Sequence, residues 1–283
     1  MKQIKNMSCG ERAVRCLTGE PVDRVPFGVG LGWCPWGSTL ERWRQESGDP
    51  NLDPARFFGY EDSFAIPEIR LGIHPPFEHV VLEETAEFSV YRDGRGITMR
   101  QRHDHGSIPE FLDYPVKNRQ DWEHLKAERL RSDSPDRVPQ DWAAFQRRLA
   151  ATGEAVRVGC FPYGVFGTVR DLMGVEATLL AFYDDPEMIH DMMQHLTTLW
   201  ISVWSQVARE VPIAHIHLWE DMSGRQGSLI SPSMVEEFMM PCYDRIAAFA
   251  RKIGVRITLY RAVQPFRGRT VLIEVAEGKA VTD

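Results

Sequence analysis

The sequence predicts an α/β fold in which parallel strands alternate with amphipathic helices, and two observations carry this prediction. Apolar runs at 155–161, 213–219 and 255–259 have the length and composition of buried strands. Between them lie two stretches, 186–207 and 231–249, in which apolar residues recur at helical spacing. Strands that alternate with long helices build βαβ units, which form a parallel sheet. We therefore expect a parallel (β/α)8 barrel of the TIM type.

The number of expected strands falls short of a closed barrel. Two earlier apolar runs, at 25–31 and 63–66, bring the count of parallel strands to about five, whereas a closed barrel has eight. Residues 258–283 contain one short candidate strand, at 271–275, and no long helix. We therefore expect an incomplete barrel with an atypical tail at 258–283, whose open sheet edge favours self-association.

An antiparallel excursion interrupts the alternation of strands and helices. Apolar and polar residues alternate on both sides of Asp93-Gly94, a dipeptide typical of hairpin turns. We expect an antiparallel hairpin over 78–102, inserted into a single barrel domain that spans 1–283.

Composition argues against several classes of partner. The formal net charge is −7 and basic residues form no long stripe, so nucleic acid is not an expected partner. No apolar run approaches the roughly 20 residues of a membrane helix, and residues 1–12 lack the apolar core of a secretory signal. The five cysteines are odd in number and scattered, which is typical of a reducing compartment. A cytoplasmic location follows as an expectation.

The expected strand at 213–219 carries the clearest set of polar side chains. Because side chains alternate along a strand, His215, His217 and Trp219 share one face, which would look into the barrel. Two interpretations of the histidines remain open. In the first, the two histidines bind a metal ion, with a neighbouring carboxylate as a third ligand. In the second, they are interior histidines whose ring nitrogens are satisfied by hydrogen bonds.

Two acids, Glu220 and Asp221, follow this strand directly. They lie at its carboxyl end, which is where the active sites of barrel enzymes are found. Paired carboxylates at such a position are costly unless they are used, so we expect both to line a pocket.

The segment FPYGVFG at 161–167 follows another expected strand and combines glycines with aromatic residues. It either brings backbone N–H groups and the rings of Tyr163 and Phe166 to a planar ligand, or forms a tight turn into a helix. Asp62 precedes the run at 63–66, where an acid serves as a cap or as a carboxylate at the barrel mouth.

Several motifs occur together in a fixed order. They are LTGEPVDRVP at 17–26, DLMGVE at 171–176, FYDDPE at 182–187 and WEDMSG at 219–224. Through these motifs the chain resembles the uroporphyrinogen decarboxylase superfamily over roughly 11–257. The resemblance implies a (β/α)8 barrel and a decarboxylase that acts on a tetrapyrrole or related substrate without metal or organic cofactor.

The resemblance also implies roles for individual residues. The family's catalytic aspartate, which accepts hydrogen bonds from pyrrole N–H groups, lies five residues before a proline, and Asp62 and Pro67 keep that spacing. Asp221 stands at the position of a serine in the family's pocket, and Thr168 stands near the position of its pocket tyrosine. Together with Glu220 these residues form the expected site.

The chain departs from the family after its first expected strand. Family decarboxylases carry two arginines there that grip substrate carboxylates, whereas this chain has LGWCPW at 31–36. Trp33 and Trp36 fit a less anionic substrate and favour an alternative, a corrinoid-dependent methyltransferase or demethylase component. The zinc-binding His-x-Cys of that branch is replaced by Tyr-Arg-Ala at 260–262.

A third interpretation is a truncated, non-catalytic tetrapyrrole binder, because the resemblance stops within an expected strand near 258. The resemblance further implies a homodimer, or a corrinoid protein as partner under the methyl-transfer alternative. The expected substrate-binding residues follow from these arguments: Trp33, Trp36, Tyr163, Phe166, Thr168, His217 and Trp219.

Overall fold

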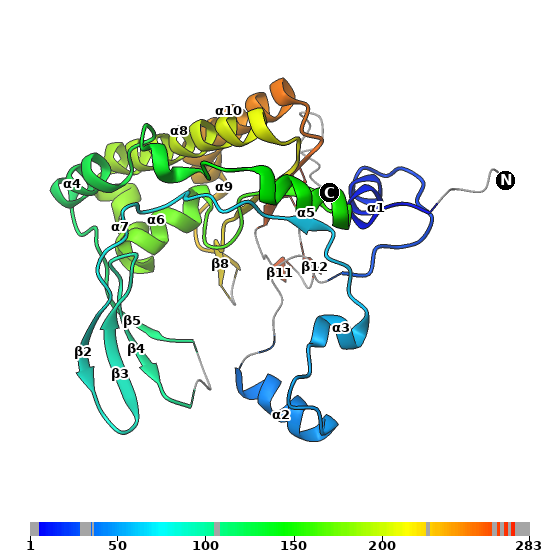
Figure 1. The fold of residues 1–283 in the computed structure, drawn as a ribbon. Coiled ribbons are helices and arrows are strands. Elements are labelled where there is room, and N and C mark those ends of the chain that lie inside the picture. The colour runs from blue at the N-terminus through cyan, green and yellow to red at the C-terminus, as the bar shows by residue number, and fades with distance from the viewer. Residues whose placement is uncertain are drawn as a thin grey trace.

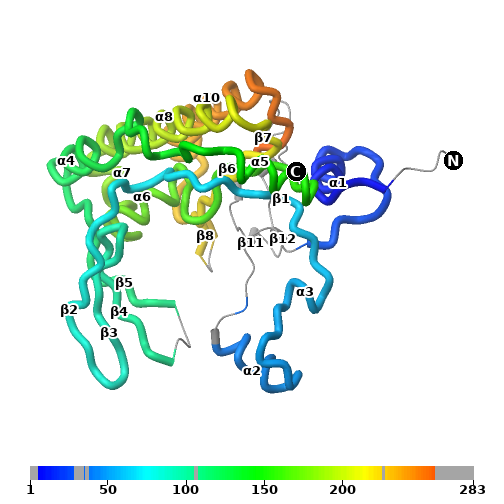
Figure 2. Tube along the Cα trace, viewed as in Figure 1, coloured from blue at the N-terminus to red at the C-terminus, as the bar shows by residue number. Residues whose placement is uncertain are grey.

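The computed structural model shows helices packed on a mainly parallel sheet, with a second, antiparallel sheet projecting from one side (Figures 1 and 2). It describes residues 6–28, 35, 37–104, 108–224, 227–261, 265–266, 269–270 and 273–274.

The elements alternate between strands and helices through most of the chain. The helices are α1 (Cys9–Leu17), α2 (Gly37–Ser47), α3 (Pro54–Phe58), α4 (Arg119–Arg129), η1 (Pro135–Arg137), α5 (Ala143–Thr152), α6 (Val165–Met173), α7 (Val175–Asp184), α8 (Pro186–Glu210), α9 (Pro232–Met234), η2 (Val235–Met239) and α10 (Met240–Ile253). The strands are β1 (Phe64–Ala65), β2 (Val80–Glu84), β3 (Phe88–Arg92), β4 (Thr98–Arg102), β5 (Glu110–Asp113), β6 (Ala155–Val158), β7 (Ile213–Trp219), β8 (Ser223–Gly224), β9 (Gly227–Ser228), β10 (Ile257–Arg261), β11 (Pro265–Phe266), β12 (Arg269–Thr270) and β13 (Ile273–Glu274).

The central sheet has the order β1-β6-β7-β10-β13. Its first four strands run parallel, and β13 pairs antiparallel with β10. The expected α/β class with a parallel sheet is therefore confirmed, whereas the described strands form an open sheet and not a closed barrel.

The strand expected at 25–31 is described by the structure only over residues 25–28. Residues 25–28 have no regular structure, and Val25 and Phe27 are exposed. The segment contains enough apolar residues for a strand, but its described part is joined to the chain before β1 by one backbone hydrogen bond, from Glu61 N–H to Phe27 O. A single bond without a buried face does not support a strand. The expectation of a strand beginning at Val25 was wrong for these described residues.

One face of the parallel sheet packs under helices. Val156 and Val158 of β6 and Ile216 and Leu218 of β7 are almost fully buried in a core shared with α6, α8 and α10. Helices α8 and α10 lie side by side along this face (Figure 2). The stripe of α8 that faces the core is fully buried: Ile189, Met192, Met193, Leu196, Trp200, Val203 and Val207.

The antiparallel excursion is broader than a hairpin. Strands β2, β3, β4 and β5 form one sheet in that order. Arg95, in the turn between β3 and β4, donates to both oxygens of Asp171 on α6 at 3.0 and 2.9 Å. This pair fixes the second sheet beside the carboxyl end of the parallel sheet.

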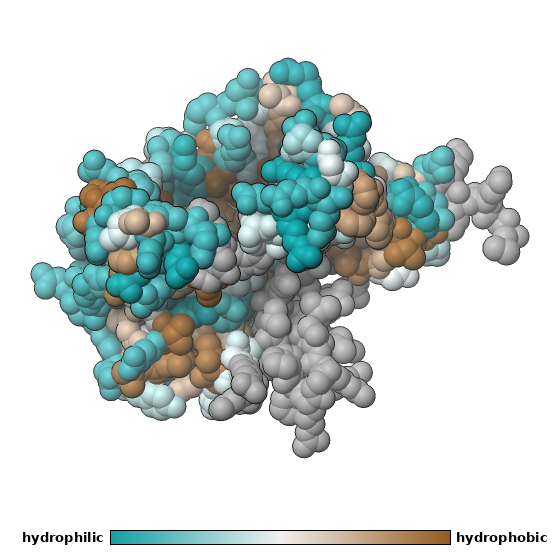
Figure 3. All heavy atoms as spheres, turned by 90° about the horizontal axis from the view of Figure 1, so that it is seen from below, coloured by the Kyte–Doolittle hydropathy of each residue, from teal (hydrophilic) through white to brown (hydrophobic). Residues whose placement is uncertain are grey.

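The surface seen from below has apolar residues scattered among hydrophilic ones (Figure 3).

A proline shapes the last long helix. The sequence predicts that Pro241 kinks the helix that begins near position 232. The structure places a π-helical turn, Val235–Met239, immediately before α10. Pro241 therefore lies in the first turn of α10, where its missing N–H group costs little. Among the described residues, the structure has no helix that is both long and apolar enough to cross a membrane.

The buried side chain of Arg137 connects the segment that follows β1 to the end of α4. Arg137 is fully buried, and its guanidinium donates four hydrogen bonds to backbone carbonyl groups. Two of them, to Arg70 and Gly72, fix the chain that leaves β1, at 2.8 and 2.9 Å. The other two, to Arg129 and Arg131, fix the end of α4, at 2.8 and 2.6 Å. Burial lowers the pKa of Arg137, and these carbonyl groups replace its lost hydration.

We expect Arg137→Lys to lower the free energy of unfolding by about 2–3 kcal/mol, because a single ammonium cannot replace a planar fork of donors in a buried site. Urea denaturation measures the change. Arg131→Lys is the matched control, since Arg131 pairs with Asp133 on the surface and both side chains are more than half exposed. That change should cost less than about 1 kcal/mol. Equal losses in the two variants would contradict the role given to Arg137.

Candidate functional site

The candidate site lies at the carboxyl ends of β6 and β7. In a parallel sheet these ends meet at one edge, and loops that leave them place side chains together. The segment after β6 runs directly into α6, and Trp219 N–H donates to Tyr163 O across the two segments at 2.8 Å.

Glu220 joins the end of β7 to the beginning of α6. Its carboxylate is fully buried and accepts hydrogen bonds from the N–H groups of Val165 at 2.9 Å, Phe166 at 2.7 Å and Gly167 at 3.3 Å. These groups begin a helix and have no partner within it, so a negative charge there is favourable. Burial raises the pKa of Glu220, while a hydrogen bond from Tyr243 and those from the backbone act in the opposite direction.

This contact requires glycine at two positions. A Cβ atom on Gly164 would lie 2.1 Å from Trp219 O and 2.8 Å from the Glu220 carboxylate. A Cβ atom on Gly167 would lie 2.5 Å from Trp219 O. The glycines of this segment thus allow close backbone approach. Glu220, expected to line a pocket, instead caps a helix and is closed to a ligand.

Asp221 points away from this buried cap. Its side chain is about one-third exposed, at 32%. Its φ of 41° lies in the left-handed region, which aspartate tolerates better than most residues. Arg170 of α6 binds it twice, with Nη2 at 2.5 Å from the carboxylate and Nη1 donating to its carbonyl oxygen at 3.2 Å. Asp221 is therefore an accessible acid in a fixed backbone position.

Aromatic side chains border this acid. The Arg170 guanidinium lies over the Trp219 ring, 5.7 Å from its centroid, and the Phe161 ring meets Trp219 edge-on at 4.7 Å. Phe161 is 61% exposed. The carboxyl edge of the sheet thus combines a carboxylate, a guanidinium cation and the flat rings of Trp219 and Phe161. This set suits a planar ligand with polar groups.

The structure places the other aromatic and hydroxyl candidates differently. Tyr163 is half-buried, and burial raises its pKa. Phe166 is fully buried and stacks on Phe182, so its ring belongs to the core and not to the edge. Thr168 is nearly buried, and its hydroxyl accepts from Gly164 N–H at 3.1 Å.

Asp62 lies at the opposite end of the sheet. It precedes β1, and β1 runs parallel to β6, so Asp62 is near the amino ends of the strands. It is exposed beside Cys9, Arg148 and Glu154. The structure therefore does not bring Asp62 together with Asp221, and it places Asp62 away from the carboxyl edge of the sheet. The spacing to Pro67 identified the segment but not the end of the strand.

His215 and His217 lie on the face of β7 opposite the helices. Both are buried, with exposures of 1% and 5%, and their ring centroids are 5.6 Å apart. Among the residues that the structure describes, no three histidine, cysteine or acidic side chains are grouped as a metal site. The zinc set of the methyl-transfer alternative does not fit either, because β10 has Tyr260 and Arg261 at the matching place.

Two expected site residues are not described by the structure, and one residue of the site was not predicted from the sequence. Trp33 and Trp36, expected to bind substrate, lie outside the described residues. The sequence analysis did not single out Arg170 of α6, which pairs with Asp221 at the end of β7. Helical spacing offers no signal for such a pair, because the partner is 51 residues away.

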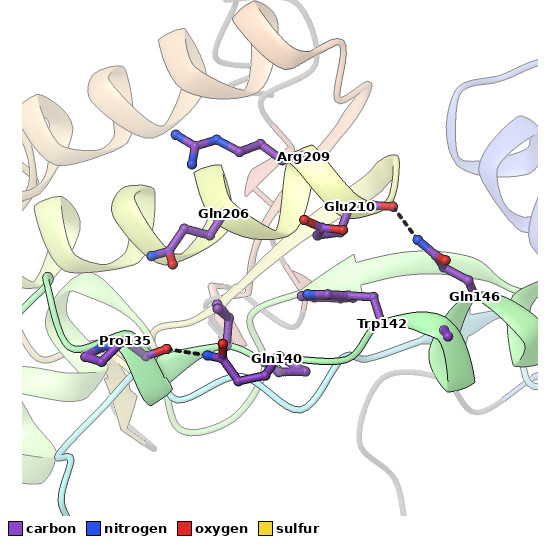
Figure 4. Close-up of a pocket in the computed structure, with 10 residues that line it drawn as sticks. Pro135, Gln140, Trp142, Gln146, Gln206, Arg209 and Glu210 are labelled. Carbon is purple, nitrogen blue, oxygen red and sulfur yellow. Dashed lines mark hydrogen bonds between the residues drawn. The ribbon is translucent and has the colours of Figure 1, made fainter.

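A separate hollow lies away from this edge. It is bordered by Pro135, Gln140, Trp142, Gln146, Gln206, Arg209 and Glu210 (Figure 4). Gln146 donates to Glu210 O at 3.1 Å, at the end of α8. Because β7 begins just after this point, the hollow is at the amino end of the strand. It contains none of the expected site residues.

One of three comparisons with known proteins, a match to a family model, agrees with the sequence motifs. The family described as "Uroporphyrinogen decarboxylase (URO-D)" matches residues 89–266. A solved structure of a methyltransferase from Methanosarcina mazei is similar with a TM-score of 0.48 and 14% identity, over 90% of this chain and 69% of its own. No curated protein matches significantly.

We expect Glu220→Gln to lower the free energy of unfolding by about 1–3 kcal/mol, because one amide oxygen must serve several buried N–H groups and the amide NH2 faces other donors. Chemical denaturation followed by circular dichroism measures the change. Asp221→Asn, at the adjacent and partly exposed position, is the control and should cost less than about 1 kcal/mol. If both variants lose equal stability, the cap does not set the geometry of the edge.

Proposed function

Because the chain belongs to the uroporphyrinogen decarboxylase family, we propose that it decarboxylates a tetrapyrrole or a related carboxylated substrate without a cofactor. The observation that carries the proposal is the partly exposed carboxylate of Asp221, at the carboxyl edge of the parallel sheet beside Trp219. The carboxyl edge is where enzymes with parallel sheets hold their reacting groups.

Asp221 is the proposed charge stabiliser, in place of Asp62. Protonation of a pyrrole ring creates a positive charge shared with its N–H group. The bond between the side-chain carbon and its carboxylate then breaks, its electron pair forms a double bond from that carbon to the ring, and carbon dioxide leaves. A proton from solvent adds to the side-chain carbon, and the ring gives back the proton that it took up, so one proton is consumed overall and the ring regains its neutral state. A carboxylate that accepts from the pyrrole N–H group stabilises the positive charge in the transition state.

Arg170 supports this role by positioning. Its guanidinium contacts both the carbonyl oxygen and the carboxylate of Asp221, so the side chain need not be ordered when the substrate arrives. The rings of Trp219 and Phe161 supply apolar faces for a macrocycle or another planar group. Glu220 has no proposed contact with substrate, and its contribution is the rigid connection to α6.

We expect Asp221→Asn to lower kcat at least about 100-fold with the fold intact, because the neutral amide removes the charge that faces the transition state. The assay supplies freshly reduced uroporphyrinogen or coproporphyrinogen and follows loss of carboxyl groups by chromatography and mass spectrometry. Asp133→Asn, at an exposed ion pair far along the chain, is the control and should keep wild-type turnover.

The same assay separates the alternatives. Porphyrin binding without turnover by the wild-type chain would replace the proposal with a non-catalytic binder. Stoichiometric zinc in the purified protein, measured by elemental analysis, together with transfer of a methyl group from a methylated corrinoid, would replace it with methyl transfer. Unchanged turnover in Asp221→Asn would remove Asp221 from the mechanism.

A further inference from the structure

The inner face of the parallel sheet, opposite the helices, carries basic side chains on neighbouring strands. Arg157 of β6 is paired in register with His215 of β7, so both side chains project from the same face. His217 follows on that face, with its ring centroid 5.6 Å from that of His215. Phe64 of β1 completes the group, 5.2 Å from His215 and beneath the Arg157 guanidinium at 5.9 Å.

His215 is costly in this position. Its side chain is 1% exposed, and neither ring nitrogen has a hydrogen-bond partner among the described residues. A buried polar group without a hydrogen-bond partner destabilises the folded state, because it loses its hydration without a replacement, whereas an apolar side chain of similar size carries no such cost. The opposite face of the same strand shows the cheaper solution, since Ile216 and Leu218 are fully buried there. Such a group in a native fold needs an explanation, and a role in binding a ligand is one.

The charges around His215 select the kind of ligand. Burial is the main cause that lowers its pKa, and the charged groups that add to this effect, His217 and Arg157, are both basic. A metal ion or an amine would meet the charge of Arg157 in a buried setting, where repulsion is strong. An anion would be attracted, and a carboxylate matches both the guanidinium fork and the N–H group of an imidazole.

We propose that the inner face of β6 and β7 is a binding subsite for an organic carboxylate, held by Arg157, His215 and His217 with Phe64 against its apolar part. This subsite is separate from Asp221 and goes beyond the proposed function, because it binds a carboxylate that is not removed. It also replaces the two interpretations given to the histidines by a third, in which they are anion ligands. Arg157 becomes a ligand-binding residue that sequence patterning alone did not single out.

The test uses sodium propionate as the carboxylate probe, with the whole chain and a thermal melt as readout. Sodium chloride at equal ionic strength gives the reference, and sodium phosphate tests an inorganic anion. Ligand bound only by the folded state raises Tm with concentration. We expect propionate to raise Tm of the wild-type chain more than chloride or phosphate does.

His215→Phe is the decisive variant, because it keeps a ring and removes both nitrogens. We expect its melting temperature without propionate to equal or exceed that of the wild type, since a costly buried polar group is gone. We expect its propionate dissociation constant to rise at least tenfold. His124→Phe, at a side chain that is 74% exposed on α4, is the control and should keep the wild-type response.

Each other outcome overturns the proposal. A propionate effect no larger than that of chloride, or an unchanged effect in His215→Phe, would remove the subsite. A larger effect of phosphate would make it an inorganic anion site. If His215→Phe does not fold, nitrogen-15 shifts of the histidine rings in the wild-type chain decide the matter. Propionate should then shift the resonances of two of the nine histidines, and no shift would contradict the subsite.

Discussion

The arrangement of the carboxyl edge depends on one contact, the Glu220 carboxylate at the beginning of α6. Backbone N–H groups of Val165, Phe166 and Gly167 converge on it, so the end of β7 and the start of a helix from the preceding βα unit are fixed to each other. A buried charge is tolerated here because these donors replace water and the helix dipole favours the anion. The glycines at 164 and 167 are the steric condition for the same approach.

Because of this contact, the two adjacent acids Glu220 and Asp221 have different environments and different roles. Glu220 is closed inside the molecule, while the next residue, Asp221, turns outward in a left-handed conformation and meets Arg170. Because Arg170 belongs to the helix that Glu220 caps, a weakened cap would also move the partner of Asp221. Stability and the geometry of the proposed site are therefore linked through α6, and a variant at Glu220 should be judged by both.

The parallel sheet uses its two faces for different purposes. Because side chains alternate along β7, Ile216 and Leu218 lie in the core with the helices, and His215 and His217 lie on the opposite face of the sheet. The apolar face stabilises the fold through burial of area. The basic face carries a cost in stability, which is the pattern expected where a fold keeps groups for binding rather than for packing.

The sequence by itself determined the alternation of strands and helices, the buried stripe of α8 and the two faces of β7, because each follows from the local period of apolar residues. Tertiary structure decided which end of a strand a residue occupies and which partner it meets. Asp62 has the spacing of a catalytic acid, yet strand direction places it at the amino edge. Phe166 reads as a loop aromatic, yet α6 begins one residue earlier and turns it into the core. Arg137 and Arg170 bind groups that are distant in sequence, and no local pattern encodes such contacts.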